Sequence, residues 1–281
     1  MFAGVLGVIA HALPAAGLAA LRFWGQTGER SDAWIAAADP VHLEARLDHL
    51  CLHALQGNSV SSDELCALFE YLQKMLGDDD RFAFVSRGCL GYLRGTGSIA
   101  TAAVSPEVID GCPPDKFMPD GNGSHDQLLS ELQMALHDHA VNLRRAAGGR
   151  LPVNSLWLWG GGTAPPLEAR PIPALFADDP LFSGYWKSCG GAIESWKGDF
   201  EQCLGVAPCS FVAVMPDDVE HSQPAAVERY LEDLRTILQR RQMCRLTLLF
   251  RDGLQVEIQA SDSLRFWRRV SSLLQDASDD G

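Results

Sequence analysis

The sequence predicts a layered α/β fold, a mixed sheet with flanking helices, whose first half has an α+β arrangement. Strand-like apolar runs alternate with helical patterns in the second half, whereas short strands follow one clear helix in the first half. A hydrophobic content of 47% in 281 residues is enough to bury a substantial core without a metal or a disulfide. We place an α+β region at residues 1–123 and an α/β region at residues 124–281.

The chain begins with an apolar stretch from Phe2 to Leu21, which has about the length that spans a bilayer. The stretch lacks a basic segment at its start, and Pro14 interrupts it. We therefore expect a buried helix or strand here, with a membrane anchor or a signal sequence as the alternative.

The clearest helix of the first half runs from Ser61 to Leu76. Ser61 and Glu64 have the spacing of a capping box, an apolar stripe follows at helical spacing, and Gly77 ends the pattern. The neighbouring predictions are an ordered segment at 34–43, strands at 47–55, 82–85 and 90–93, and a loop at 96–123.

One long helix is predicted at residues 126–147, where leucines recur on one face and two glycines follow. A strand at 153–159 leads into Gly160, Gly161 and Gly162, which predict a turn. The remaining predictions are strands at 211–215, 245–250 and 254–258, a helix at 224–242 and a helical segment at 263–274.

Charge and cysteine content narrow the possible functions. A net charge of −13 repels nucleic acid and anionic lipid, so we expect neither as a partner. The eight cysteines form no C-x-x-C pair, which is typical of free thiols in a reducing compartment. We therefore expect a cytoplasmic protein.

Three ordered motifs carry a resemblance to a known family. Residues 131–162 read ELQMALHDHAVNLRRAAGGRLPVNSLWLWGGG, residues 38–43 read ADPVHL, and residues 265–269 read RFWRR. In this combination the chain resembles the RpfE-type proteins, bacterial regulatory proteins linked to the control of pathogenicity factors. The resemblance spans about four fifths of the chain and implies a regulatory role.

The central block also resembles the archaeal-type cofactor-independent phosphoglycerate mutases of the alkaline phosphatase superfamily. In those enzymes a His-Pro-x-Asn-x-x-Arg helix leads into an Asn-x-x-Trp-x-Trp-Gly strand, and Ala140 stands here in place of the proline. The resemblance implies a mutase-derived, alkaline-phosphatase-like fragment in which residues 1–123 correspond to the mutase insert domain. It implies a ligand site at His139, Asn142, Arg145, Asn154, Trp157, Trp159, Gly160, Gly161 and Gly162.

Mutase chemistry would need two divalent metal ions, Mn or Mg, and a hydroxyl nucleophile. The first 60 residues offer three aspartates and no nucleophile motif, whereas Asp217 and His221 have the D-x-x-x-H spacing that the mutases use for metal. A solvated acidic turn is the alternative for that pair. His49, Cys51 and His53 alternate along a predicted strand as a zinc set, although side chains on a flat strand seldom converge on one ion.

Each part of the implied ligand site has a structural alternative. The three glycines could cradle a phosphate or only make a tight turn. Arg145 could hold an anionic substrate or pair with Glu131 or Asp138, and Asn154 could cap a turn. The two tryptophans share one face of their strand, and we expect them to be packed in the interior.

We expect a non-catalytic regulatory or scaffold protein that needs no cofactor and that binds a protein partner or senses a phosphorylated metabolite. The first alternative is a metal-dependent mutase or phosphatase in which Arg145 holds the substrate. The second alternative is a structural subunit of a larger assembly that docks through its apolar N-terminus.

Overall fold

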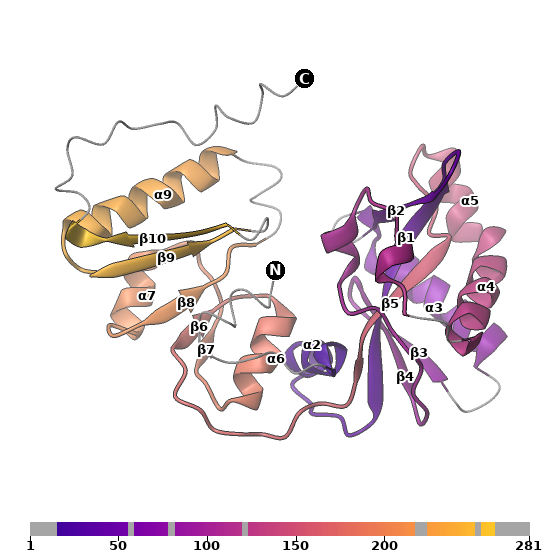
Figure 1. Cartoon of the computed structure of the whole chain (residues 1–281), viewed down its shortest axis with the longest axis horizontal. Coiled ribbons are helices and arrows are strands. Elements are labelled where there is room, and N and C mark those ends of the chain that lie inside the picture. Colours follow the sequence, from indigo (N-terminus) through magenta and orange to yellow (C-terminus); the bar gives the residue numbers. More distant parts are fainter. Residues whose placement is uncertain are drawn as a thin grey trace. The chain divides into compact units, whose positions relative to one another are not determined.

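The computed structural model describes residues 16–55, 59–77, 82–119, 123–216, 224–250 and 254–261. Most of the apolar stretch at 2–21, the pair Asp217 and His221, and the segment 263–274 lie outside these residues. The described chain forms two compact units, one of residues 16–195 with Val212–Val214 and one of Trp196–Phe211 with the described part of 215–261 (Figure 1).

The larger unit is built on a five-stranded antiparallel sheet. Its central strand β1 (Trp34–Ala45) pairs along one edge with β2 (Leu50–Ala54) and β4 (Leu90–Gly95), and along the other edge with β5 (Ser155–Gly162). Strand β3 (Phe82–Arg87) forms a hairpin with β4, and both lie where short strands were predicted. Because β5 joins β1, strands from both sides of residue 123 share this sheet, and the division predicted there falls inside the unit.

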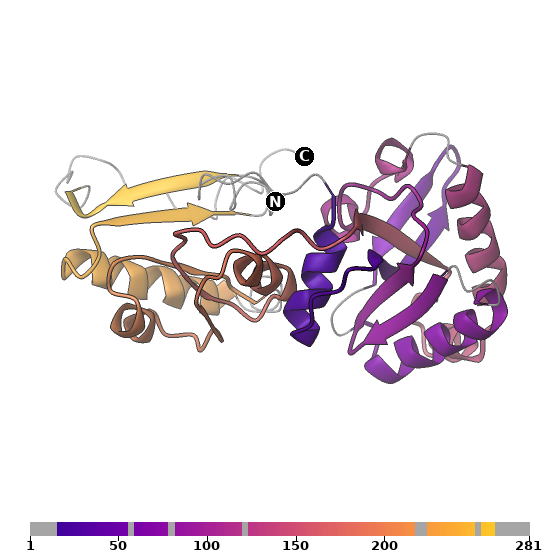
Figure 2. The ribbon, with the colours of Figure 1, turned by 90° about the horizontal axis from the view of Figure 1, so that it is seen from below.

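One face of the sheet is covered by α3 (Ser62–Leu76), α4 (Gly123–His137) and α5 (Ala140–Ala147) (Figures 1 and 2). The predicted capping box is confirmed, since the Ser61 side chain accepts the Glu64 N–H while the Glu64 carboxylate accepts the Ser61 N–H. The main core between sheet and helices comprises Ala36, Ala38, Leu65, Leu68, Phe69, Leu72, Phe84, Leu93, Leu132, Leu136, Leu156 and Leu158.

The single helix predicted at 126–147 is wrong, because α4 and α5 are separate helices. His139 has an extended backbone, with φ −66° and ψ 138°, and its side chain caps α5. An extended residue interrupts the helical hydrogen bonds, although the apolar spacing continues across the break.

The opposite face of the sheet carries α2 (Leu18–Thr27), which packs against α6 (Pro180–Ser188). The two helices touch at glycines: a Cβ added to Gly184 would lie 1.8 Å from the Leu21 carbonyl oxygen, and one on Gly25 would lie 1.7 Å from that of Pro180. Only the end of the predicted buried segment at 2–21 is described, and there residues 18–21 belong to α2, in which Ala19, Ala20 and Leu21 are buried.

Shorter elements complete the larger unit. The predicted loop at 96–123 contains two 3-10 turns, η2 (Pro106–Ile109) and η3 (Asp115–Phe117). A three-stranded sheet in the order β7-β6-β8 joins β6 (Ala174–Phe176), β7 (Ile193–Glu194) and β8 (Phe211–Ala213), of which only β8 was predicted.

The smaller unit contains α7 (Phe200–Val206), α9 (Pro224–Gln239) and a hairpin of β9 (Arg245–Leu249) and β10 (Gln255–Gln259), which lie where two strands were predicted. Trp196, Phe200 and Tyr230 pack as an aromatic cluster between α7 and α9, with ring centroids 4.9–5.9 Å apart. The layered α/β fold class is confirmed. No helix within the described part of the chain is long and apolar enough to cross a membrane.

Candidate functional site

Asn142 joins three segments of the larger unit. Its side chain is buried, and its Nδ2 donates to the carbonyl oxygens of Leu136 and Val153, each at 2.7 Å. Its Oδ1 accepts the Val153 N–H at 2.8 Å. The end of α4, helix α5 and the approach to β5 are therefore held together by one amide group.

Arg145 lies one turn farther along α5, with a side chain that is 1% exposed. Its Nε donates to the Leu151 carbonyl oxygen at 2.8 Å, and its Nη1 donates to the Ser59 carbonyl oxygen at 2.8 Å and to the Glu64 carboxylate at 2.9 Å. The pairing predicted with Glu131 or Asp138 is wrong, because the guanidinium points from α5 toward the start of α3 rather than along its own helix.

Glu64 receives two arginines as well as the capping N–H. Arg150 binds the other carboxylate oxygen at 2.7 Å, so Glu64 bridges the residues that flank the end of α5. Burial by itself raises the pKa of Glu64, but the Ser61 N–H and the two guanidinium groups outweigh it and hold the pKa below its usual value. The carboxylate is therefore a fixed anionic anchor for α5.

His139 caps α5 through its Nδ1, which accepts the Val141 N–H at 3.3 Å. Its ring packs on Tyr71 of α3, with 4.8 Å between the ring centroids. Burial and the charge of Arg144 lower its pKa, which favours the neutral imidazole that this cap requires.

The residues at the start of β5 bind neighbouring backbone. The Asn154 amide accepts the Leu43 N–H at 2.8 Å and donates to the Leu43 carbonyl oxygen at 2.9 Å, so it continues the pairing of β5 with β1. Trp157 donates its indole N–H to the Val104 carbonyl oxygen at 2.9 Å. Trp157 and Trp159 are both buried, which confirms interior packing on the face opposite the two core leucines of β5.

The turn predicted at Gly160–Gly162 is wrong, because β5 continues through these glycines. The Gly160 and Gly161 N–H groups donate to the Ala102 carbonyl oxygen and the Thr101 hydroxyl, each at 2.9 Å. Gly160 has φ +61°, and a Cβ on Gly161 would lie 2.8 Å from the Trp34 ring. Close backbone approach thus explains the glycines, and ligand binding by them stays a prediction.

A buried polar cluster on the α2 face of the sheet, formed by Arg22, Asp39, Tyr92 and Trp159, is called the Asp39 cluster below. Asp39 is fully buried and accepts two hydrogen bonds from the Arg22 guanidinium, each at 2.8 Å, and one from the Trp159 indole at 2.6 Å. The guanidinium also lies over the Tyr92 and Trp159 rings and donates to the Gly91 carbonyl oxygen.

Electrostatics act on two charged groups in and beside the Asp39 cluster, Arg22 and Glu107. Burial lowers the pKa of Arg22, but the Asp39 charge outweighs it and holds the pKa above its ordinary value, so the guanidinium stays charged. Glu107 of η2 lies at the surface, but the surrounding protein partly desolvates its carboxyl group. This desolvation, together with the Asp39 charge, raises the pKa of Glu107 to about 7. Glu107 is thus a carboxyl group that can exchange a proton near neutral pH.

The sequence prediction missed the Asp39 cluster. Asp39 and Arg22 are single charged residues within apolar runs. A charge that is buried in such a run needs an oppositely charged partner, but the pattern does not show which residue the partner is. The two residues lie 17 positions apart on a helix and a strand, so only the packing of α2 on the sheet brings them together.

The three candidate zinc ligands, His49, Cys51 and His53, lie in different surroundings. His49 is exposed and pairs with Asp48, Cys51 is buried, and His53 binds the Glu44 carboxylate at 2.9 Å. Over the described ranges, no group of three or more His, Cys, Asp or Glu side chains could hold a metal ion, so the zinc set does not converge. All eight cysteines belong to these ranges and are free thiols.

Comparison with known proteins finds relatives for part of the chain. No known family model matches the sequence. The chain is 29% identical over 136 residues to the 2,3-bisphosphoglycerate-independent phosphoglycerate mutase of Methanosarcina barkeri, covering 46% of this chain and 34% of that protein. It is 30% identical over 131 residues to a probable mutase of the same kind from Geobacter sulfurreducens, covering 44% of this chain and 32% of that protein.

Among solved structures, the PH0037 protein from Pyrococcus horikoshii matches with a TM-score of 0.50 and 15% identity, over 87% of this chain and 66% of that one. This likeness shows a shared fold. The chain spans about a third of the length of the curated relatives that it matches. Nearly half of the chain is therefore similar in sequence to a part of cofactor-independent phosphoglycerate mutases.

Proposed function

We propose that this chain is a non-catalytic regulatory protein of the RpfE type, built on part of a phosphoglycerate-mutase-like fold and acting in the cytoplasm. It acts by binding, either to a protein partner or to a small phosphorylated metabolite, and it needs no cofactor for this role.

One observation carries the proposal: the polar residues of the mutase-like block serve the scaffold. Asn142 and Asn154 each bind backbone groups on a neighbouring segment, and buried Arg145 binds two backbone carbonyl oxygens and Glu64. Groups engaged in this way stabilise the fold and are not presented to a substrate. They supply a reason to retain the block that is independent of turnover.

A turnover assay tests the proposal. The purified 281-residue chain is incubated with 3-phosphoglycerate and Mn²⁺, and formation of 2-phosphoglycerate is followed by a coupled enolase assay, with metal content measured on the same sample. We expect no interconversion above the protein-free control. Turnover that depends on bound Mn²⁺ would replace the regulatory role with the catalytic alternative.

The catalytic alternative is supported by the names of the curated relatives, which are mutases. In that alternative Asp217 and His221 would hold Mn or Mg, and Arg145 would hold the substrate. Asp217→Ala and His221→Ala would then abolish both turnover and metal binding, whereas the regulatory proposal predicts no effect of either change on metal content.

The two binding modes are separated by a thermal-shift titration with 3-phosphoglycerate and related phosphorylated acids. A shift that saturates would support metabolite sensing. The absence of any shift would leave recognition of a protein partner as the mode of action.

A further inference from the structure

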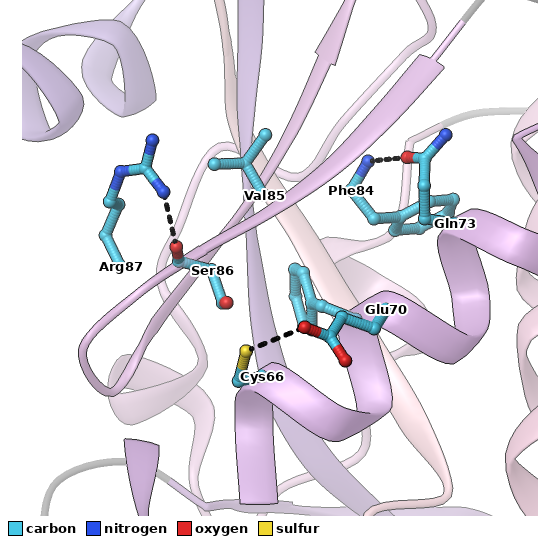
Figure 3. A pocket seen from close by; sticks show the side chains of 8 residues that line it. Cys66, Glu70, Gln73, Phe84, Val85, Ser86 and Arg87 are labelled. Atoms are coloured by element: carbon cyan, nitrogen blue, oxygen red, sulfur yellow. Dashed lines mark hydrogen bonds between the residues drawn. The ribbon is translucent and has the colours of Figure 1, made fainter. Parts of the chain in front are cut away.

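A hollow of about 470 Å³ lies between α3 and the neighbouring strand β3 (Figure 3). The buried rings of Phe69 and Phe84 lie in it, in an edge-to-face contact with centroids 6.2 Å apart. Cys66, Glu70 and Gln73 line it from the helix, and Val85, Ser86 and Arg87 line it from the strand. The hollow therefore combines an apolar floor with polar walls.

The strand that borders this hollow is an edge strand in the described sheet, since β3 pairs only with β4 there. The Phe84 N–H donates to the Gln73 side-chain oxygen at 2.8 Å, so it points away from β4. In an antiparallel pair this direction recurs at every second residue, which places the Ser86 N–H and carbonyl on the open edge as well.

Flexible side chains occupy two of these edge groups. Gln73 accepts the Phe84 N–H, and the exposed Arg87 guanidinium donates to the Ser86 carbonyl oxygen at 3.1 Å. Both side chains can rotate away, so a backbone from another chain can take over their hydrogen bonds. An edge satisfied in this way differs from one covered by a helix or blocked by proline.

The rim of the hollow has two opposite charges. Glu70 accepts a hydrogen bond from the Cys66 thiol, and Arg87 binds backbone, but neither forms an ion pair with any residue that the structure describes. A ligand that presents an acidic group toward Arg87 and a basic group toward Glu70 would satisfy both. A segment of polypeptide can carry these two charges and the backbone groups together.

We propose that the hollow between α3 and β3 docks an extended segment of a partner protein, which adds to β3 as a further strand. Its backbone pairs with Phe84 and Ser86, an apolar side chain rests on the two phenylalanines, and an acidic and a basic side chain meet Arg87 and Glu70. This inference rests on the partner-binding form of the proposed function and names the surface that would serve it.

The test begins by selecting binders for the intact chain from a random peptide library, and then measures each fluorescein-labelled peptide by fluorescence anisotropy. Ser86→Pro removes an outward N–H and leaves the bonds between β3 and β4 in place. We expect it to raise the Kd about tenfold or more, while the matched Ser86→Ala, which retains the N–H, leaves the Kd unchanged.

Two further variants sharpen the result. Gln73→Ala frees the Phe84 N–H and should lower the Kd, since the peptide no longer competes with the side chain. Arg87→Glu should raise the Kd for peptides that carry an acidic residue. If Ser86→Pro lowers the Tm, amide exchange on the unaltered chain replaces it, and bound peptide should slow exchange of the Ser86 N–H.

The docking site is overturned if the library yields no peptide that binds, if the selected peptides bind Ser86→Pro as tightly as the unaltered chain, or if peptide leaves Ser86 exchange unchanged. Each result would still leave metabolite sensing within the proposed function. Mutase turnover would instead overturn the regulatory role without altering the measured peptide affinities, so the two failures are distinguishable.

Discussion

Replacing Asp39 with asparagine should be among the most destabilising conservative changes in the larger unit. Asp39 is fully buried and its partner Arg22 is 5% exposed, so Asp39→Asn leaves a guanidinium in the interior without a counter-charge. It also disturbs three hydrogen bonds of 2.6–2.8 Å. Breaking such a buried pair by removing one partner costs about 3–5 kcal/mol.

The change in stability is measured by urea unfolding, followed by far-UV circular dichroism and by tryptophan fluorescence, since Trp159 belongs to the cluster. The matched control is Asp32→Asn, which breaks an exposed aspartate–arginine pair and should cost less than about 1 kcal/mol. A cost for Asp39→Asn that equals the control would refute the assignment of Arg22 and Asp39 as a buried ion pair.

Single substitutions at a helix contact and at two carboxyl groups should change stability in distinct ways. Gly184→Ala should lower the free energy of unfolding by about 1–3 kcal/mol, because the added Cβ would lie 1.8 Å from the Leu21 carbonyl oxygen. Gly97→Ala, with open space around it, should be neutral in the same thermal unfolding experiment. Equal Tm values for the two variants would contradict the contact between α2 and α6. Glu64→Gln should lower the Tm at neutral pH and have no effect in acid, because a group with a lowered pKa in the folded state confers stability that is lost as the pH falls through that pKa. A Tm difference that persists at low pH would contradict this prediction. Glu107→Gln should become stabilising as the pH rises from 4.5 to about 7, because the raised pKa of Glu107 means that its ionisation destabilises the folded state. A Tm difference between the variant and the unaltered protein that does not change with pH would contradict the raised pKa.

The sequence was sufficient to predict those elements that depend on residues close together along the chain. The capping box at Ser61 and Glu64 located α3, because both of its hydrogen bonds lie within four residues. Strands β3, β4, β9 and β10 lie where short apolar runs predicted strands, whereas their pairing into two hairpins was found only in the structure. These elements need little information from the rest of the fold.

The break at His139 shows what apolar spacing misses. The resembling mutases have a proline where this chain has Ala140, and a residue before proline is driven toward extended backbone. His139 adopts that conformation without the proline, with its ring caught between Tyr71 and the Val141 N–H. Comparison of the motif with the sequence could have located the break, whereas periodicity could not.

The polar network could be predicted only as a set of residues, not as a set of contacts. Arg145 finds its carboxylate in Glu64, 81 positions earlier, and Asp39 finds Arg22 on a helix that packs across the sheet. Nothing in local spacing encodes these pairings, because they depend on the packing of whole elements. For the same reason, the hollow between α3 and β3 could not be predicted from the sequence.

The central claim, that the mutase-like block is retained as scaffold, is tested most directly by the unfolding free energy of Arg145→Met. The variant removes hydrogen bonds to Leu151, Ser59 and Glu64, and we predict a loss of about 3 kcal/mol against a neutral effect of Arg144→Met, its exposed neighbour. An Arg145→Met chain that is as stable as the unaltered protein, and that has lost binding to 3-phosphoglycerate, would contradict the claim and identify Arg145 as a ligand residue.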